Sequence, residues 1–150
     1  MNQNDFAQPI LIVEDSDDDY EATERALKRD GKLGNELIRC SNGQQALDFL
    51  LRDGAHSGRT SPNPSIVLLD LNMPGIDGRA VLKRIKSDDS IKHIPVVVLT
   101  TSNAQTDIDA CYSAGANTCI YKPVELDGFF SAVQQVRDYW LNIAMLPRID

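Results

Sequence analysis

Five short runs of apolar, mostly β-branched residues recur along the chain, and segments with helical spacing separate them. The runs predict β-strands at residues 10–14, 37–40, 66–70, 96–100 and 119–121. The first, third and fourth runs are apolar up to their last residue instead of alternating with polar residues. This pattern is typical of central parallel strands that are buried on both faces.

Apolar residues recur every three or four positions between and after these runs, which predicts a helix after each strand. The clearest stripe lies in the last segment and consists of Leu126, Phe129, Phe130, Val133, Val136, Trp140 and Leu141. Ser16 followed by the acidic residues 17–19 is typical of a helix N-terminus, so the first helix is expected directly after the first strand. The strict alternation predicts an α/β fold, a doubly wound five-stranded parallel sheet with helices on both faces.

The composition fits a single domain and narrows the possible partners. The chain has 150 residues and a formal net charge of −7, which disfavours binding to nucleic acids and to anionic membranes. No apolar run approaches the ~20 residues of a membrane span, and the N-terminus lacks the features of a signal peptide. Three cysteines without a Cys-x-x-Cys pair argue against a disulfide framework or a zinc site and favour a reducing, cytoplasmic location.

Charged and polar side chains stand where the predicted strands end, and in an open parallel sheet ligands bind beyond these ends. Glu14 and Asp15 close the first strand, Asp70 the third and Thr100 the fourth, and Lys122 follows the fifth. Each residue alone has an ordinary explanation, such as a helix cap, a turn or a solvated lysine. Together, the three carboxylates repel one another unless cations neutralise them, which favours bound Mg²⁺ beside the lysine. Such a site can accept a phosphoryl group.

The ordered set of motifs resembles the receiver domain of two-component response regulators. The resemblance extends over residues 9–141 and rests on Glu14-Asp15, Leu68-Leu69-Asp70-Leu71-Asn72-Met73-Pro74-Gly75, Asp77-Gly78, Leu99-Thr100 and Lys122-Pro123. It implies a flavodoxin-like fold of five parallel strands. In such a fold, Gly75 and Gly78 are expected to allow the tight backbone path after the third strand.

The resemblance also implies a role for the acidic residues. Asp70 would accept a phosphoryl group from a phosphohistidine of a sensor histidine kinase. The chain would then be a phosphoacceptor that catalyses its own phosphorylation and dephosphorylation, not an enzyme with a separate substrate. The side chains of Asp15 and Asp70 and the backbone carbonyl of Asn72 would hold Mg²⁺, and Glu14 would assist, partly through water.

The resemblance further implies that Thr100 hydrogen-bonds the phosphoryl oxygens, and that Lys122 pairs first with the acceptor carboxylate and then with the phosphoryl group. In many receivers, an aromatic residue three positions before this lysine changes rotamer on activation. Here that position is Cys119, and Tyr121 is expected on the opposite face of the strand, so the usual switch is expected to be absent or modified. The Lys122–Pro123 bond is a candidate for the cis form.

The flanking segments complete the expected organisation, with a flexible N-terminus at residues 1–8 and a C-terminal extension at residues 142–150. Apolar side chains near the C-terminus exceed what one core-facing stripe needs, which favours an interface; they are Tyr139, Trp140, Ile143, Met145 and Leu146. With a long Gly- and Pro-rich loop at residues 53–65, this tail resembles that of the cyanobacterial phytochrome-associated single-domain response regulators. The resemblance implies a phytochrome-type light-sensing histidine kinase as partner, a homodimer through the last helix and tail, and output through protein contacts.

Three other classes of protein share some of these features. A phosphatase of the haloacid dehalogenase type needs an Asp-x-Asp motif on its first strand, whereas Asp70 is on the third strand and is followed by Leu71 and Asn72. A flavin-binding protein needs a phosphate-binding loop after the first strand, and the four acidic residues within 14–18 would repel a phosphate. A phosphorylation-independent pseudo-receiver that acts as a dimeric binding module stays open.

Overall fold

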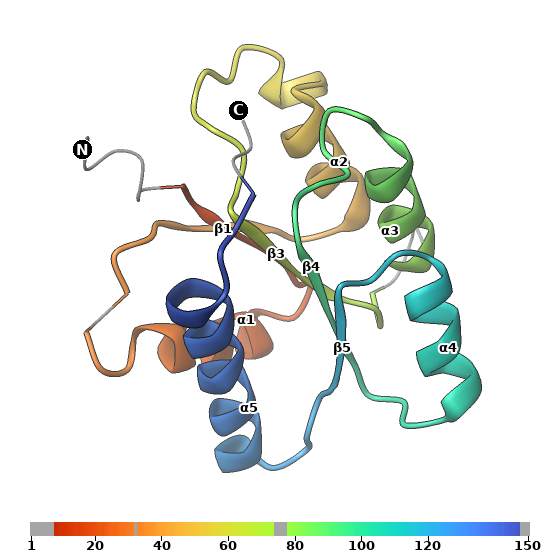
Figure 1. The fold of residues 1–150 in the computed structure, drawn as a ribbon. Coiled ribbons are helices and arrows are strands. Elements are labelled where there is room, and N and C mark those ends of the chain that lie inside the picture. Colours follow the sequence, from red (N-terminus) through yellow and green to blue (C-terminus); the bar gives the residue numbers. More distant parts are fainter. Residues whose placement is uncertain (1–7, 32, 74–77, 148–150) are drawn as a thin grey trace.

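The computed structural model describes residues 8–31, 33–73 and 78–147 of the chain (Figure 1). Five strands occur within these residues: β1 (Ile10–Val13), β2 (Leu37–Cys40), β3 (Ile66–Asp70), β4 (Val96–Thr100) and β5 (Thr118–Tyr121). Helices follow them: α1 (Asp17–Lys28), α2 (Gly43–Leu51), α3 (Gly78–Ser87), α4 (Gln105–Ser113) and α5 (Leu126–Asp138). All five predicted strands are confirmed, and only the first and last differ in length, by one residue each.

The five strands form one parallel sheet in the order β2-β1-β3-β4-β5, with helices on both faces. The predicted doubly wound, flavodoxin-like architecture is therefore confirmed. The chain reverses its direction of winding between β1 and β3, and ligands bind at such a point in open parallel sheets. The carboxyl ends of the strands share one edge of the sheet, so the loops after β1, β3, β4 and β5 lie together there.

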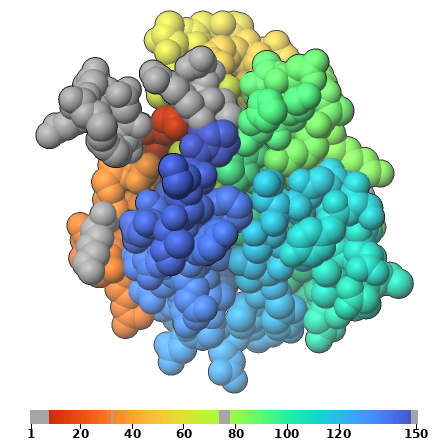
Figure 2. Space-filling view, in the orientation of Figure 1, coloured from red at the N-terminus to blue at the C-terminus, as the bar shows by residue number. Residues whose placement is uncertain are grey.

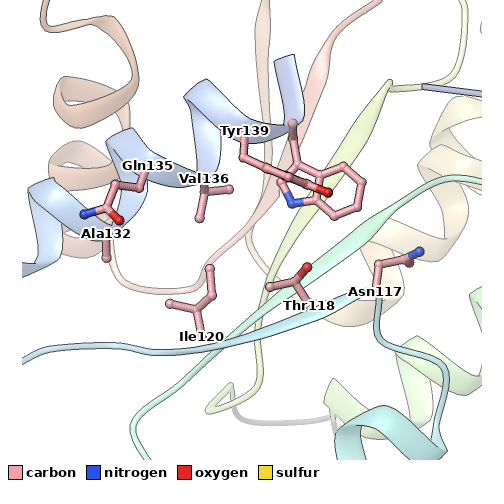
Figure 3. Close-up of a pocket in the computed structure, with 8 residues that line it drawn as sticks. Asn117, Thr118, Ile120, Ala132, Gln135, Val136 and Tyr139 are labelled. Atoms are coloured by element: carbon pink, nitrogen blue, oxygen red, sulfur yellow. The ribbon is translucent and has the colours of Figure 1, made fainter. Parts of the chain in front are cut away.

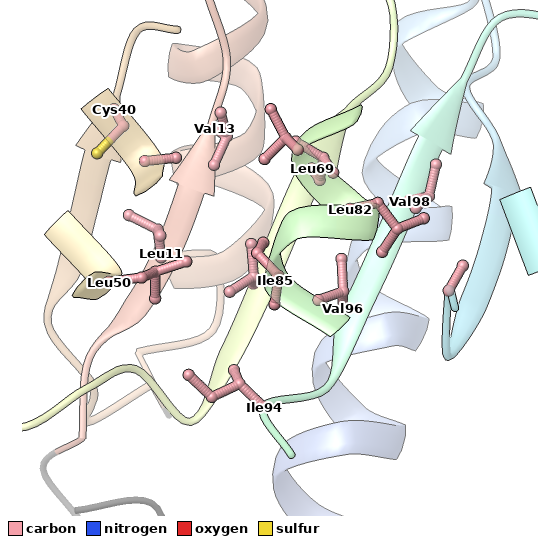
Figure 4. Packing of buried hydrophobic residues seen from close by; sticks show 14 of the residues in the cluster. Leu11, Val13, Cys40, Leu50, Leu69, Leu82, Ile85, Ile94, Val96 and Val98 are labelled. Atoms are coloured by element: carbon pink, nitrogen blue, oxygen red, sulfur yellow. The ribbon is translucent and has the colours of Figure 1, made fainter. Parts of the chain in front are cut away.

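Two apolar clusters fill the space between the sheet and its helices. On one face, Val81, Leu82 and Ile85 of α3 pack against β1, β3 and β4 together with apolar residues of α2 and α4 (Figure 4). On the other face, α1 and α5 lie side by side and cover alternate residues of the same strands. Because β1, β3 and β4 are buried on both sides, the positions of the residues at their ends are fixed by close packing.

The start of α1 was expected from the acidic run after Ser16. The Ser16 hydroxyl oxygen accepts the Asp19 backbone N–H at 3.2 Å, which caps the helix as predicted. In a full capping box the side chain three residues after the cap, here that of Asp19, would accept the Ser16 backbone N–H in return. Here the Glu14 carboxylate accepts that N–H at 3.3 Å instead. The carboxylate of Asp19 is thereby available for another partner.

Two loops shape the surroundings of the sheet. At Gly78, an added Cβ would lie 2.9 Å from the Leu71 Cα, so the close approach after β3 requires glycine there, as expected; Gly75 lies outside the described residues. The loop at residues 53–65 contains a short 3₁₀-helix (Gly54–His56) and is organised by Arg59. The Arg59 guanidinium stacks on the Phe49 ring at 4.0 Å and donates to the Phe49 carbonyl at 2.6 Å. This surface loop is therefore tied to α2.

The C-terminal part continues beyond α5 as a π-helical turn, η3 (Tyr139–Ile143), and becomes extended at Ala144. Trp140 packs against the apolar cluster between the sheet and α5, whereas Tyr139, Ile143 and Met145 are exposed. The tail thus combines a partly buried anchor with exposed apolar residues. Among the residues that the structure describes, none of the helices has the length and hydropathy of a membrane span.

Candidate functional site

The polar residues at the strand ends meet at one edge of the sheet, as the sequence predicts. Glu14 and Asp15 directly follow β1, Asp70 and Thr100 are the last residues of β3 and β4, and Lys122 directly follows β5. The Lys122 ammonium lies 3.1 Å from the Glu14 carboxylate and 3.5 Å from that of Asp70. The backbone N–H of Lys122 donates to the Thr100 carbonyl at 2.7 Å, which ties the ends of β4 and β5 together.

Burial makes this cluster electrostatically unusual. Glu14 and Asp70 are almost completely buried, Lys122 is buried as well, and Asp15 is exposed. Burial, assisted by hydrogen bonding and repulsion from Asp70, raises the pKa of Glu14 from 4.5 to about 7 against the opposing effect of Lys122. Burial alone would lower the pKa of Lys122, but the surrounding carboxylates outweigh it and raise that pKa above its ordinary value. The lysine therefore stays charged at neutral pH.

Three carboxylates form a donor set that suits a hard divalent cation. Oxygen atoms of Glu14, Asp15 and Asp70 all lie within 4.8 Å of one another. Mg²⁺ prefers oxygen ligands, uses one or two carboxylates and keeps several waters. Because Asp15 is exposed while the other two are buried, the set is open to solvent on one side. These residues therefore fit Mg²⁺ or a similar ion.

The two carboxylate oxygens of Asp70 have different partners. Its Oδ1 accepts the Asn72 backbone N–H at 2.9 Å, and its Oδ2 faces the Lys122 ammonium. The Asn72 side chain donates to the Thr101 hydroxyl at 2.9 Å, which fixes the loop after β3 against the loop after β4. One oxygen of Asp70 is thus oriented by the backbone and the other by a cation.

A small cavity lies between the segments that follow β3 and β4. It has a volume of about 110 Å³ and is lined by Leu71, Asn72, Arg79, Thr100, Ser102 and Asp107. The buried Thr100 hydroxyl accepts the Ser102 N–H at 3.1 Å, and the Ser102 hydroxyl donates to the Asp107 carboxylate at 2.6 Å. The predicted Thr100 therefore lines a polar recess together with Leu71 and Asn72, the two residues that follow Asp70.

Two residues of the site were missed by the sequence analysis. Asp19 of α1 was assigned to the helix start, yet its carboxylate lies 2.6 Å from the Lys122 ammonium. Arg39 of β2 donates to the backbone carbonyls of Glu14 at 3.1 Å and Asp15 at 3.3 Å. Arg39 thereby fixes the acidic loop after β1. Their positions in the sequence could have pointed to them, because α1 directly follows this loop and β2 pairs with the strand before it.

The face assigned to Tyr121 was wrong. Along β4 and β5, Val98 is paired with Cys119 and Thr100 with Tyr121. Side chains alternate between the faces of a strand, so residues two positions apart share a face. Tyr121 is therefore on the same face as Cys119, half exposed. Cys119 packs against the apolar cluster, and its backbone N–H donates to the Tyr112 hydroxyl of α4 at 3.1 Å.

The bond before Pro123, a candidate for the cis form, is trans. Among the described residues, which include Lys122 and Pro123, every peptide bond is trans. The Lys122 backbone N–H continues the ladder between β4 and β5, so the chain enters the following turn without needing the cis form.

Comparisons with known proteins agree with this fold and site. The sequence model of the response regulator receiver domain matches residues 10–134. Response regulator Rcp1 of Synechocystis sp. is 41% identical over 138 residues, which are 92% of each chain. The probable methanogenesis regulatory protein FilR2 of Methanothrix harundinacea is 38% identical over 134 residues, 89% of this chain and 83% of that protein.

Solved structures extend the similarity to three dimensions. The phosphorylated cyanobacterial phytochrome response regulator RcpA matches with a TM-score of 0.88 and 36% identity, over 95% of this chain and 99% of that chain. The Mn²⁺-bound form of response regulator Rcp1 matches with a TM-score of 0.87 and 40% identity, over 94% of this chain and 99% of that chain. Because these matches span nearly the whole length on both sides, the chain belongs to the response regulator receiver domain family and is related to response regulator Rcp1.

Proposed function

We propose that the chain accepts a phosphoryl group on Asp70 from a phosphohistidine of a sensor histidine kinase. The observation that carries the proposal is the buried Asp70 carboxylate, which shares one edge of the sheet with Lys122 and a divalent-cation donor set. An Asp70 oxygen forms a new bond to phosphorus. The bond between phosphorus and the donor imidazole nitrogen breaks, and the leaving nitrogen keeps the electron pair.

The neighbouring residues supply positioning and charge, which are the main requirements of phosphoryl transfer. In the proposed site, Asp15, Asp70 and the backbone carbonyl of Asn72 hold Mg²⁺, and Glu14 assists. Mg²⁺, when bound, neutralises the charge on the phosphoryl oxygens. Thr100 donates a hydrogen bond to one of these oxygens, and the Lys122 ammonium faces another.

The signal ends when water hydrolyses the acyl phosphate, so the chain acts as a phosphoacceptor and not as an enzyme with a separate substrate. In this proposal residues 9–141 form the receiver domain and residues 142–150 an extension. Output passes through protein contacts. A phytochrome-type light-sensing kinase is the proposed donor, because RcpA is a phytochrome response regulator. The odd number of cysteines favours a cytoplasmic location for the reaction.

A homodimer through α5 and the tail is the proposed assembly. A groove of about 540 Å³ lies between β5 and α5, where Thr118 and Ile120 face Ala132 and Val136 and Tyr139 closes one end (Figure 3). Figure 2 shows α5 and the following residues, in blue, at the molecular surface beside α4. Further along the tail, Ile143 and Met145 expose additional apolar side chains, and such exposed apolar groups are common at protein interfaces.

Incubation with acetyl phosphate and Mg²⁺ tests the phosphoacceptor proposal. We expect intact mass spectrometry to detect a gain of one phosphoryl group, and prior addition of EDTA to prevent it. An Asp15→Asn variant is expected to need more Mg²⁺ for the same gain, because one carboxylate ligand is lost. An unmodified wild-type mass would favour the alternative, a pseudo-receiver that acts only as a binding module.

Replacing Ile143 and Met145 together by serine is expected to shift a dimer towards monomer, as measured by sedimentation velocity. The double substitution removes two highly exposed apolar side chains of the tail but leaves the backbone and the Trp140 anchor in place. Truncation after Leu141 is expected to have the same direction of effect. An unaltered sedimentation profile in both variants would exclude the tail as the main interface.

A further inference from the structure

The Lys122 ammonium has three carboxylate neighbours, and the nearest is not one of the predicted site residues. Its distances are 2.6 Å to Asp19, 3.1 Å to Glu14 and 3.5 Å to Asp70. The side chains of Glu14 and Asp70 are 3% and 4% exposed, whereas that of Asp19 is 44% exposed. The lysine is therefore drawn away from Asp70 and towards the start of α1.

We infer that Asp19 is a positioning residue, which competes with Asp70 for Lys122 and thereby slows phosphoryl uptake. The inference rests on the proposed phosphoacceptor function of Asp70. It gives Asp19 a role beyond the helix start, since the Ser16 cap uses only the backbone N–H of Asp19 and leaves its carboxylate for Lys122.

Both competing residues are held by hydrogen bonds that do not involve Lys122, Asp19 through its backbone and Asp70 through its carboxylate. The Asp19 N–H and carbonyl are engaged by the side chains of Ser16 and Thr23, at 3.2 and 2.8 Å. The Asp70 carboxylate accepts the Asn72 N–H. Lys122 is anchored through its own backbone N–H to the Thr100 carbonyl. A change of partner therefore requires only rotation of the lysine side chain.

Phosphorylation changes which partner is favoured. A phosphoryl group on Asp70 replaces one negative charge by about two, and a cation beside it becomes more strongly bound. Lys122 can neutralise that charge only by giving up its close contact with Asp19. The ion pair with Asp19 thus stabilises the unphosphorylated arrangement and opposes the reaction. Removing the Asp19 carboxylate is expected to lower this opposition.

Replacing Asp19 by alanine tests the inference, with Asp18→Ala as the matched control. Asp18 is exposed in the same helical turn and carries the same charge. We expect Asp19→Ala to take up phosphoryl from acetyl phosphate about fivefold faster than Asp18→Ala, because a partly exposed ion pair contributes up to about 1 kcal/mol. Asp19→Glu keeps the carboxylate and is expected to restore the slow rate. Thermal unfolding of the two alanine variants checks that both fold equally.

Equal rates in the two alanine variants, or a slower Asp19→Ala, would overturn the inference. A crystal structure of Asp19→Ala decides the matter independently of phosphorylation. There we expect the Lys122 ammonium to move from 3.5 Å to about 2.8 Å from the Asp70 carboxylate. A lysine that stays in place contradicts the competition. A wild-type chain that takes up no phosphoryl group contradicts the proposed function instead, and the crystallographic result then still decides this inference.

Discussion

Asp70→Asn is expected to abolish phosphoryl uptake completely while the chain stays folded. An amide is not a competent nucleophile towards phosphorus, whereas a carboxylate is. Asparagine keeps the shape of the side chain, and its oxygen can still accept the Asn72 N–H. The substitution also removes the repulsion that Asp70 exerts on Glu14, so no loss of thermal stability is expected.

Intact mass after incubation with acetyl phosphate and Mg²⁺ measures this effect. Asp53→Asn is a suitable control, because it removes one exposed carboxylate from the loop before β3 and should leave uptake unchanged. A phosphoryl group found on Asp70→Asn would show that the acceptor is another residue. In that case peptide mapping of the modified chain would identify it.

Without Mg²⁺, the free energy of unfolding is expected to fall as the pH rises from about 5 to about 8. Burial, and next the neighbouring Asp70, raise the pKa of Glu14 from 4.5 to about 7 in the folded chain. Between these two pH values the folded state binds more protons than the unfolded state, so the free energy of unfolding decreases as the pH rises. The decrease is complete once the pH exceeds the pKa of Glu14 in the folded chain. The effect of this one buried group is at most about 3 kcal/mol.

Denaturant titrations in EDTA at pH 5.5 and pH 8 measure this dependence. Glu14→Gln is expected to flatten it and to raise stability at pH 8, whereas the exposed Glu36→Gln should not. Added Mg²⁺ is expected to remove the fall, since a metal ion favours ionised ligands. If the pH dependence persists in Glu14→Gln, other titrating groups cause it.

The strands and the residues at their ends could be predicted because both follow from simple regularities. Continuous apolar runs indicate central parallel strands, and parallel strands bring their carboxyl ends together. Asp70 and Lys122 were identified in this way although 52 positions of sequence separate them. Their convergence needs only the strand order, not the details of side-chain packing.

Asp19 and Arg39 could not be identified in the same way, because their roles depend on side-chain direction. An aspartate in the first turn of a helix is explained by the helix dipole alone. An arginine on an outer strand is explained by solvation. Only the structure shows that Asp19 turns towards Lys122 and Arg39 towards the loop after β1. The error at Tyr121 was of another kind, since the alternation of the strand already placed it on the face of Cys119.

The hydroxyl of Tyr112 has a consequence for the behaviour of this chain at high concentration. Strand β5 is at the edge of the sheet, and its outward backbone groups are a template on which a strand of another molecule could align. The Tyr112 hydroxyl already occupies the Cys119 N–H at the middle of that edge. Because this N–H already has a partner, strand-by-strand growth into fibres along β5 is discouraged.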